Sequence, residues 1–264
     1  TFGQAVMEVC VLGSGSKGNS IYVSGGGTSL LVDAGLSARE LTARLREAGL
    51  SPQSLQGILL THDHEDHYRG VEVFSRKFAL PLFANEGTAS GVEARYPGVA
   101  FQWQIFETAS AFEVGGLRVE AFTVPHDAAD PVGFVFDDGA SRLCVVTDLG
   151  QATPLVCAKL ARCHAAIVES NHDYDMLMQS DRPWSLKTRI AGRSGHLSND
   201  DAAALMSTTI PGQMHTLWLA HLSEACNTPA LALNTMRQAL AKAGRADVRV
   251  EVLSQSQVSS RFTF

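Results

Sequence analysis

The chain has 264 residues, of which 45% are hydrophobic and 18% charged, and this composition excludes an intrinsically disordered protein, a collagen-like fibre and a coiled coil. The formal net charge of -6 argues against a protein that binds nucleic acid or anionic lipid through its whole surface, so an anionic substrate needs a local positive field from a metal ion or a short basic segment. The five cysteines form no CxxC pair and no segment has the roughly 20 apolar residues of a membrane span, which predicts a cytoplasmic protein with reduced thiols.

The whole chain, residues 1–264, is expected to form one domain, because no long linker or low-complexity segment interrupts it. We interpret Met7 as the natural start, so residues 1–6 are left out of the fold prediction. The start of the chain does not have the basic segment and long apolar stretch of a secretion signal.

The first third of the chain predicts a meander of three strands followed by a helix. Ser37 and Glu40 have the spacing of a capping box, so we expect a helix that begins after Ser37 and ends at Gly49. A short apolar strand then leads directly into the polar segment 61–67, which places that segment at a strand end. The expected strands are 8–12, 21–23, 29–32, 56–60 and 81–84, and a second helix is expected over 68–78.

The rest of the chain predicts a run of short strands and then strands that alternate with helices. Gly-Gly and Asp-Asp-Gly turns between residues 100 and 146 favour antiparallel pairing over an ordinary doubly wound parallel sheet. The α/β pattern therefore predicts two packed sheets flanked by helices, and the similar segments 30–35 (LLVDAG) and 145–150 (VVTDLG) indicate a duplicated βα half. The expected strands are 101–106, 111–114, 117–122, 133–137, 143–146, 165–168, 217–220 and 248–253, and the expected helices are 154–163, 200–208 and 229–243.

The segment 61–67, Thr-His-Asp-His-Glu-Asp-His, concentrates three imidazoles and three carboxylates directly after a buried strand. His62 and His64 project the same way from an extended loop and can bind one ion, whereas Asp66 and His67 turn toward a neighbouring ion. A divalent ion near four-coordination needs about three or four protein ligands, so this loop cannot complete two sites alone. We therefore expect two divalent metal ions, with further ligands at downstream strand ends.

Three downstream residues of metal-binding type, His126, Asp148 and His221, each follow an apolar strand, where a rigid scaffold presents side chains to a shared rim. A carboxylate such as Asp148 can bridge two cations. Asp33 also ends a strand, but it would overfill the sites as a ligand, so we interpret it as a hydrogen-bonding support of the ligand loop. The predicted metal ligands are His62, His64, Asp66, His67, His126, Asp148 and His221.

The strand-terminal Asp33, the His-x-His-x-Asp-His pattern of 62–67, His126, Asp148 and His221 together resemble the metallo-β-lactamase superfamily over nearly the whole chain. This resemblance implies an α/β fold, a four-layer αββα metallo-β-lactamase sandwich with a dinuclear site along one edge. Four shorter segments are similar to the YycJ/WalJ-type branch, for which a 5′–3′ exonuclease activity on DNA is described. They are 13–20 (GSGSKGNS), 169–173 (ESNHD), 195–199 (GHLSN) and 220–227 (AHLSEACN).

The resemblance implies a phosphodiesterase in which water between two zinc or manganese ions loses a proton near pH 7 and attacks the substrate as a metal-bridging hydroxide. Asp66 is expected both to hold the second ion and to orient that hydroxide. His196 lies outside the ligand set, and we expect it to protonate the departing alkoxide or to bind phosphate. Capping of the helix that follows it is the alternative role.

The segment 181–193 supplies the local positive field, with four basic residues, one acid and Trp184. Cations for phosphates beside an aromatic platform are typical of a nucleic-acid groove, although such a segment can also be an exposed loop without a partner. The glycine-rich loop 13–19 lacks the P-loop spacing, and we interpret it as a turn that needs glycine. The predicted substrate-binding residues, with DNA as the expected substrate, are Arg182, Lys187, Arg189 and Arg193.

Two other functions stay open at this stage. A metal-dependent hydrolase of a small acyl substrate, such as a lactone, thioester or β-lactam, would use the same ligands but has less need of His196 and the basic segment. A metal-dependent binding or regulatory module that has lost catalysis is the second, and the complete ligand set argues against it.

Overall fold

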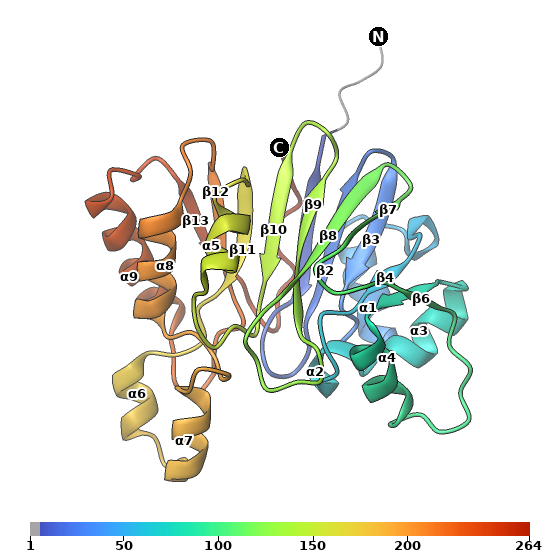
Figure 1. Cartoon of the computed structure of the whole chain (residues 1–264), viewed down its shortest axis with the longest axis horizontal. Helices are drawn as coiled ribbons and strands as arrows, with labels where there is room; N and C mark the ends of the chain where they lie inside the picture. Colours follow the sequence, from blue (N-terminus) through green and yellow to red (C-terminus); the bar gives the residue numbers. More distant parts are fainter. Residues whose placement is uncertain (1–5) are drawn as a thin grey trace.

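Two seven-stranded sheets lie face to face in the computed structural model, and helices cover the outer face of each (Figure 1). The structure describes residues 6–264. Residues 1–5, which belong to the segment left out of the fold prediction, lie outside the described part. The layers are helices, sheet, sheet and helices, so the predicted four-layer α/β sandwich is confirmed. Within residues 6–264, no helix combines the length and the apolar character that a membrane span requires.

The first sheet contains the predicted meander. Its strands β1 (Glu8–Gly13), β2 (Ser20–Gly25) and β3 (Thr28–Val32) pair antiparallel. The sheet continues from β3 through three parallel strands, β4 (Ile58–Leu59), β5 (Leu82–Ala84) and β6 (Trp103–Ile105). At the opposite edge, β14 (Phe262–Thr263) pairs antiparallel with β1.

The second sheet repeats this arrangement. Its antiparallel half consists of β7 (Ala111–Val114), β8 (Leu117–Thr123), β9 (Val132–Asp137) and β10 (Arg142–Val146). Its parallel half extends from β10 through β11 (Ala165–Glu169), β12 (Thr216–Ala220) and β13 (Arg249–Val252).

The strands β3 and β10 hold equivalent places, because each has an antiparallel neighbour on one side and a parallel neighbour on the other. Each ends at an aspartate in the left-handed region, Asp33 with φ 61° and Asp148 with φ 54°. This symmetry agrees with the duplicated βα half that the two similar sequence segments indicate. It also means that the carboxyl ends of the parallel strands in both sheets meet at one edge of the sandwich (Figure 1).

The helices pack on the outer faces through apolar stripes. Beside the first sheet lie α1 (Ala38–Glu47), the 3₁₀ turn Pro52–Ser54, α2 (Glu65–Tyr68), α3 (Val71–Phe78) and α4 (Glu86–Glu93). Beside the second lie α5 (Pro154–Leu160), α8 (Asn199–Thr209) and α9 (Pro229–Lys242), while α6 (Tyr174–Gln179) and α7 (Trp184–Ile190) project beyond the sandwich at the lower left of Figure 1. The capping box of Ser37 and Glu40 is present as predicted.

Successive side chains of a strand point to opposite faces of the sheet, and this divides the core into layers. Leu30 and Val32 of β3 belong to the cluster between the sheets, whereas Leu31 packs under the helices of the first sheet. In β10, Val145 lies between the sheets and Val146 lies under the helices of the second. Because both faces of each central strand are buried near its carboxyl end, residues 30–32 of β3 and 143–146 of β10 form uninterrupted apolar runs.

Several expected elements differ in the structure. The helix expected over 68–78 begins later, as α3 at Val71, because Tyr68 ends the short helix α2. Gly70 lies between the two helices, and a Cβ atom there would lie 2.1 Å from the carbonyl oxygen of Leu36. The strand expected over 101–106 joins the first sheet and is parallel to β5, so antiparallel pairing holds for only half of each sheet. The helices α4, α6 and α7 were not predicted, and α7 occupies much of the basic segment 181–193.

Candidate metal centre

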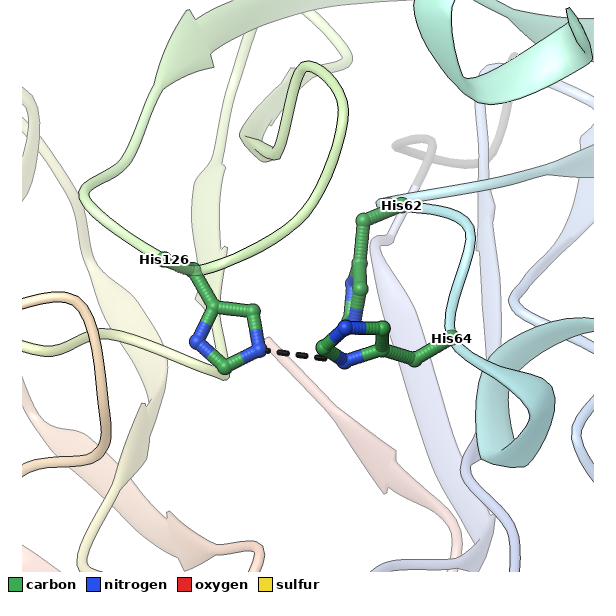
Figure 2. Close-up of side chains that lie close together, drawn as sticks. All are labelled: His62, His64 and His126. Atoms are coloured by element: carbon green, nitrogen blue, oxygen red, sulfur yellow. Dashed lines mark hydrogen bonds between the residues drawn. The ribbon is translucent and has the colours of Figure 1, made fainter. Parts of the chain in front are cut away.

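The loop after β4 presents His62 and His64 to one side. His64 has an extended backbone and immediately precedes the short helix α2, so the following residues turn away from it. His126, in the loop after β8, faces this pair from the opposite side (Figure 2). The ring centroid of His62 lies 4.6 Å from that of His64 and 5.1 Å from that of His126. His126 Nε2 and His64 Nδ1 are 3.2 Å apart, so three imidazoles converge on one point.

A second cluster forms where α2 meets the end of β12. Asp66 Oδ2 lies 3.5 Å from both His67 Nε2 and His221 Nε2. His221 directly follows β12 and has a left-handed backbone, with φ 56°. Non-glycine residues occupy this region rarely, and such backbone strain concentrates at functional sites.

Asp148 lies between the two clusters. Its Oδ2 atom is 3.2 Å from His67 Nε2, and its Oδ1 atom is 3.8 Å from His126 Nε2. The carboxylate therefore faces both groups of imidazoles, as a bridging ligand must. All seven residues predicted as ligands are brought together at this edge of the sandwich.

The donor set fits divalent cations. His62 Nε2, Asp148 Oδ2 and His221 Nε2 are buried polar atoms that form no hydrogen bond with the described residues. Buried polar atoms normally have partners, and imidazole nitrogens with carboxylate oxygens are the ligands of zinc, manganese and similar ions. Convergent unpartnered nitrogens and an oxygen are therefore the arrangement expected of a metal centre.

The carboxylates make this site favourable for positive charge. Burial opposes protonation of His67, but Asp148 and Asp33 raise the pKa of His67 well above its ordinary value. The pKa of His221 is likewise raised, because the neighbouring carboxylates outweigh burial. Burial lowers the pKa of His62 well below its ordinary value, which keeps that imidazole neutral. A divalent cation supplies positive charge while its imidazole ligands stay neutral.

Asp33 supports the ligand loop, as predicted. Its Oδ1 atom accepts a hydrogen bond from the backbone N–H of Thr61 at 2.9 Å, and its Oδ2 atom lies 2.8 Å from His67 Nδ1. These contacts fix the orientation of the His67 ring and leave Nε2 to face Asp66 and Asp148.

Glu169, at the end of β11, is a site residue that the sequence analysis missed. It is fully buried, and its Oε1 atom accepts hydrogen bonds from His196 Nδ1 at 2.7 Å and His221 Nδ1 at 2.9 Å. Its Oε2 atom accepts from the backbone N–H groups of Leu149 and Leu197. Burial raises the pKa of Glu169, but the two imidazoles outweigh it and lower the pKa to about 2. A glutamate directly after the apolar strand 165–168 was the available signal.

The glycine-rich loop 13–19 touches the centre, so its interpretation as a turn that merely needs glycine was incomplete. Ser14 Oγ accepts a hydrogen bond from the backbone N–H of His221 at 2.8 Å. Asn19 Nδ2 donates to Asp66 Oδ2 at 3.2 Å. The loop approaches because the amino-terminal strands and β12 end at the same edge of the two sheets.

His196 and Arg189 lie at the mouth of the centre. The His196 side chain is 22% exposed and shares a hollow with His64, Ile190 and Arg189. Arg189 Nε donates to Asp127 Oδ2 at 2.5 Å, and Asp127 directly follows His126. A group that enters this hollow therefore meets an imidazole and a guanidinium together.

The other basic residues are placed differently. Lys187 is not presented to a groove, contrary to its prediction as a substrate-binding residue. It is buried, and its Nζ atom donates to the carbonyl oxygen of Met178 at 2.6 Å, in the last turn of α6. Arg193 is exposed and Arg182 half-buried, and neither belongs to the two histidine clusters. Trp184, at the start of α7, is 69% exposed.

Comparison with known proteins places these features in a family. The sequence pattern described as a beta-lactamase superfamily domain matches residues 28–221. The chain is 38% identical over 239 residues to the exodeoxyribonuclease YycJ of Bacillus anthracis, covering 90% of each protein. It is 37% identical over 236 residues to the exodeoxyribonuclease WalJ of Streptococcus pneumoniae, covering 88% of each. The structure superposes on the metallo-beta-lactamase fold protein YhfI of Bacillus subtilis with a TM-score of 0.73 at 14% identity, covering 99% of this chain and 100% of YhfI.

Proposed function

This chain belongs to the metallo-β-lactamase superfamily, and from that premise we propose that it is a dinuclear metal-dependent phosphodiesterase, an exonuclease that degrades DNA from the 5′ end. The observation that carries the proposal is the pair of histidine and carboxylate clusters that share Asp148, beside a hollow that contains His196 and Arg189. The names of the two relatives that cover about nine-tenths of the chain support DNA as the substrate.

Two divalent ions, zinc or manganese, are the proposed cofactors. The residues that would hold the first are His62, His64 and His126, those that would hold the second are Asp66, His67 and His221, and Asp148 would contact both. Bound there, the cations would lower the pKa of water toward neutrality and offset charge on the phosphodiester.

The chain's own groups have separate tasks in hydrolysis. Asp66, at the mouth of its cluster, would orient the attacking water. Hydrolysis breaks the bond between phosphorus and the departing oxygen, and that oxygen needs a proton. His196 is the proposed donor, because Glu169 accepts from Nδ1 and thereby leaves Nε2 for the substrate. Glu169 is a positioning residue in this scheme, since it acts through His196 and His221.

Substrate binding is assigned to Arg182, Arg189 and Arg193, with the exposed Trp184 ring as a surface for a base. Guanidinium groups bind phosphates, and aromatic rings stack on bases without regard to sequence. These cations lie on or beside α7, which contributes Leu186, Arg189 and Ile190 to the lining of the hollow that contains His196. Because the chain as a whole has a net charge of -6, nucleic acid would then be confined to this cationic region.

A hydrolase of small acyl substrates is not favoured. The relatives that match most of the chain are named exodeoxyribonucleases, and an acyl hydrolase has no evident use for the arginines at the mouth. A module without catalysis is disfavoured by the complete set of converging ligands.

In the test, metal-replete protein digests DNA that is labelled at either the 5′ or the 3′ end. Bound metal is measured on the same protein sample. We expect stepwise release of the 5′ label, and almost none by the variant Asp66→Ala. Asp200→Ala, which removes an exposed carboxylate on α8, is the matched control and should digest DNA as the unsubstituted protein does. Unchanged digestion by Asp66→Ala, or hydrolysis of a thioester or lactone but of no DNA, would contradict the proposal.

A further inference from the structure

A second hollow adjoins the metal centre and shares His64 and Arg189 with the hollow that contains His196. It has a volume of about 540 Å³, and its floor includes His64 and Asp66. Its walls come from segments far apart in the sequence: the end of α2, the segment after α4, and α7. The cationic groups that line it are Arg69, Arg95 and Arg189.

The wall formed by Arg69 is held firmly. Arg69 Nε donates to Glu65 Oε1, and Arg69 Nη1 donates to the carbonyl oxygen of Lys17, each at 3.1 Å. Tyr96 Oη donates to the carbonyl oxygen of Arg69 at 3.2 Å. The Tyr96 ring packs edge-on against Tyr68, with a centroid separation of 6.0 Å. A rigid guanidinium loses little entropy when it binds an anion.

The acidic groups of this hollow already have partners. Glu65 pairs with Arg69, and Asp63 Oδ1 accepts a hydrogen bond from the backbone N–H of Ala129 at 3.1 Å. Asp66 belongs to the second histidine cluster. Arg95 is exposed, and the ion pairs of residues 6–264 include Arg69 and Arg189 but not Arg95. An unpaired guanidinium therefore faces a hollow that adjoins the metal centre.

The two hollows differ in size. The one that contains His196 has a volume of about 220 Å³ and is partly lined by Leu186 and Ile190. Arg189 lines both hollows, and His64 belongs to the lining of both. A substrate strand at the metal centre thus meets two adjoining compartments, a small one that contains His196 and a larger one that contains the unpaired Arg95.

On the basis of the exonuclease function proposed above, we propose that the large hollow binds the strand that remains after cleavage, through the phosphate next to the scissile one, with Arg95 and Arg69 as its cationic ligands. The departing terminal nucleotide occupies the small hollow, because its oxygen must receive the proton of His196. The strand behind the scissile phosphate is long and anionic, which requires an open compartment with cations. Arg95 and Arg69 are thereby assigned a role in substrate binding.

The test measures kcat/KM on deoxythymidine oligonucleotides of two to eight nucleotides. A dinucleotide has only the scissile phosphate, whereas longer strands place a further phosphate in the large hollow. For the metal-replete wild type, kcat/KM should rise with length. In Arg95→Ala, we expect the ratio of kcat/KM for the octamer to kcat/KM for the dinucleotide to fall about fivefold, because one phosphate contact is lost. The slope of log KM against log salt concentration should also fall by about 0.7, which is the value for one phosphate contact of a single strand.

Arg76→Ala is the matched control, because Arg76 is a 75% exposed arginine of α3 that pairs with Glu72 outside this hollow. It should keep the wild-type length dependence, and Arg95→Lys should recover part of it. An equal loss at every length, or no loss at any length, in Arg95→Ala would overturn the inference. Failure of the wild type to cleave any oligonucleotide would instead refute the exonuclease function itself.

Discussion

Glu169 accepts a hydrogen bond from His196 Nδ1 at 2.7 Å, and the same Oε1 atom lies 2.9 Å from His221 Nδ1. One buried carboxylate therefore orients both the proposed proton donor and a proposed metal ligand. Side chains that orient ligands in this way commonly affect metal affinity and activity as strongly as some ligands do.

Glu169→Gln should lower kcat on DNA and metal affinity, each by about 10- to 100-fold. The Oε2 atom of Glu169 accepts hydrogen bonds from two backbone N–H groups. The glutamine side chain must therefore place its NH₂ group either against those two donors or against the two histidines, and each orientation loses hydrogen bonds that the carboxylate makes. Metal titration followed by turnover measurements at saturating metal separates the two losses. Glu47→Gln, an exposed substitution on α1, is the control. Wild-type values in Glu169→Gln would show that the carboxylate does not position these rings.

His196→Ala should keep its bound metal but lose about 10²- to 10⁴-fold in kcat on DNA, the usual contribution of a general acid. A p-nitrophenyl ester of thymidine 5′-phosphate has a leaving group that needs no proton, so its hydrolysis should suffer much less. Comparison of the two substrates tests the role directly. Equal losses on both would assign His196 to substrate binding or to structure rather than to proton donation.

Removal of divalent ions with a chelator should abolish DNA cleavage and lower the melting temperature. The buried carboxylate of Asp148 and the partly exposed carboxylate of Asp66 would then lack a cation, and ions that bind only the folded state stabilise it by mass action. Calorimetry with and without added zinc or manganese measures the shift, and readdition should restore both properties. A melting temperature that is independent of metal would contradict a metal centre at this edge.

Ser14→Ala should lower the free energy of unfolding by about 1 kcal/mol and weaken metal binding. The Ser14 hydroxyl accepts from the backbone N–H of His221, whose left-handed backbone needs such support. Asn171 Nδ2 donates to the carbonyl oxygen of the same residue at 2.7 Å, so Asn171→Ala should have a similar effect. Urea denaturation and metal titration are the measurements. Ser16→Ala, in the same loop but with an exposed side chain, should change neither quantity.

Arg189 and Lys187 lie two positions apart and should respond to substitution in different ways. Arg189→Ala should raise KM for DNA several-fold, because Arg189 lines both hollows. Lys187→Ala should instead lower the free energy of unfolding by about 1–2 kcal/mol, because a buried hydrogen bond to Met178 is lost. Steady-state kinetics and urea denaturation of both variants distinguish the two roles. A higher KM in Lys187→Ala with unchanged stability would restore Lys187 to the binding surface.

Much of the fold follows from local patterns. The strands are apolar runs with period two or continuous burial, and the capping box at Ser37 begins α1 where the pattern predicts. The elements that were missed have weak local signals. α4 contains two glycines and a serine in eight residues, and it forms because Asn85 caps it and Val92 packs against the core. A helix stabilised mainly by tertiary packing has little to reveal it in the sequence.

The ligand residues could be named before the structure because their chemistry is local: histidines and aspartates that directly follow apolar strands meet at one edge when the strands are parallel. Glu169 also ends an apolar strand, so the sequence marked it as a candidate for the same edge, but its role and that of Ser14 depend on the partners that packing brings to them. The same reason explains the failure for Lys187, whose charge indicates a surface while the packing of α6 against α7 buries it. Residue type and strand order thus determined which groups could bind metal, and the packing of distant loops decided which groups hold them in place.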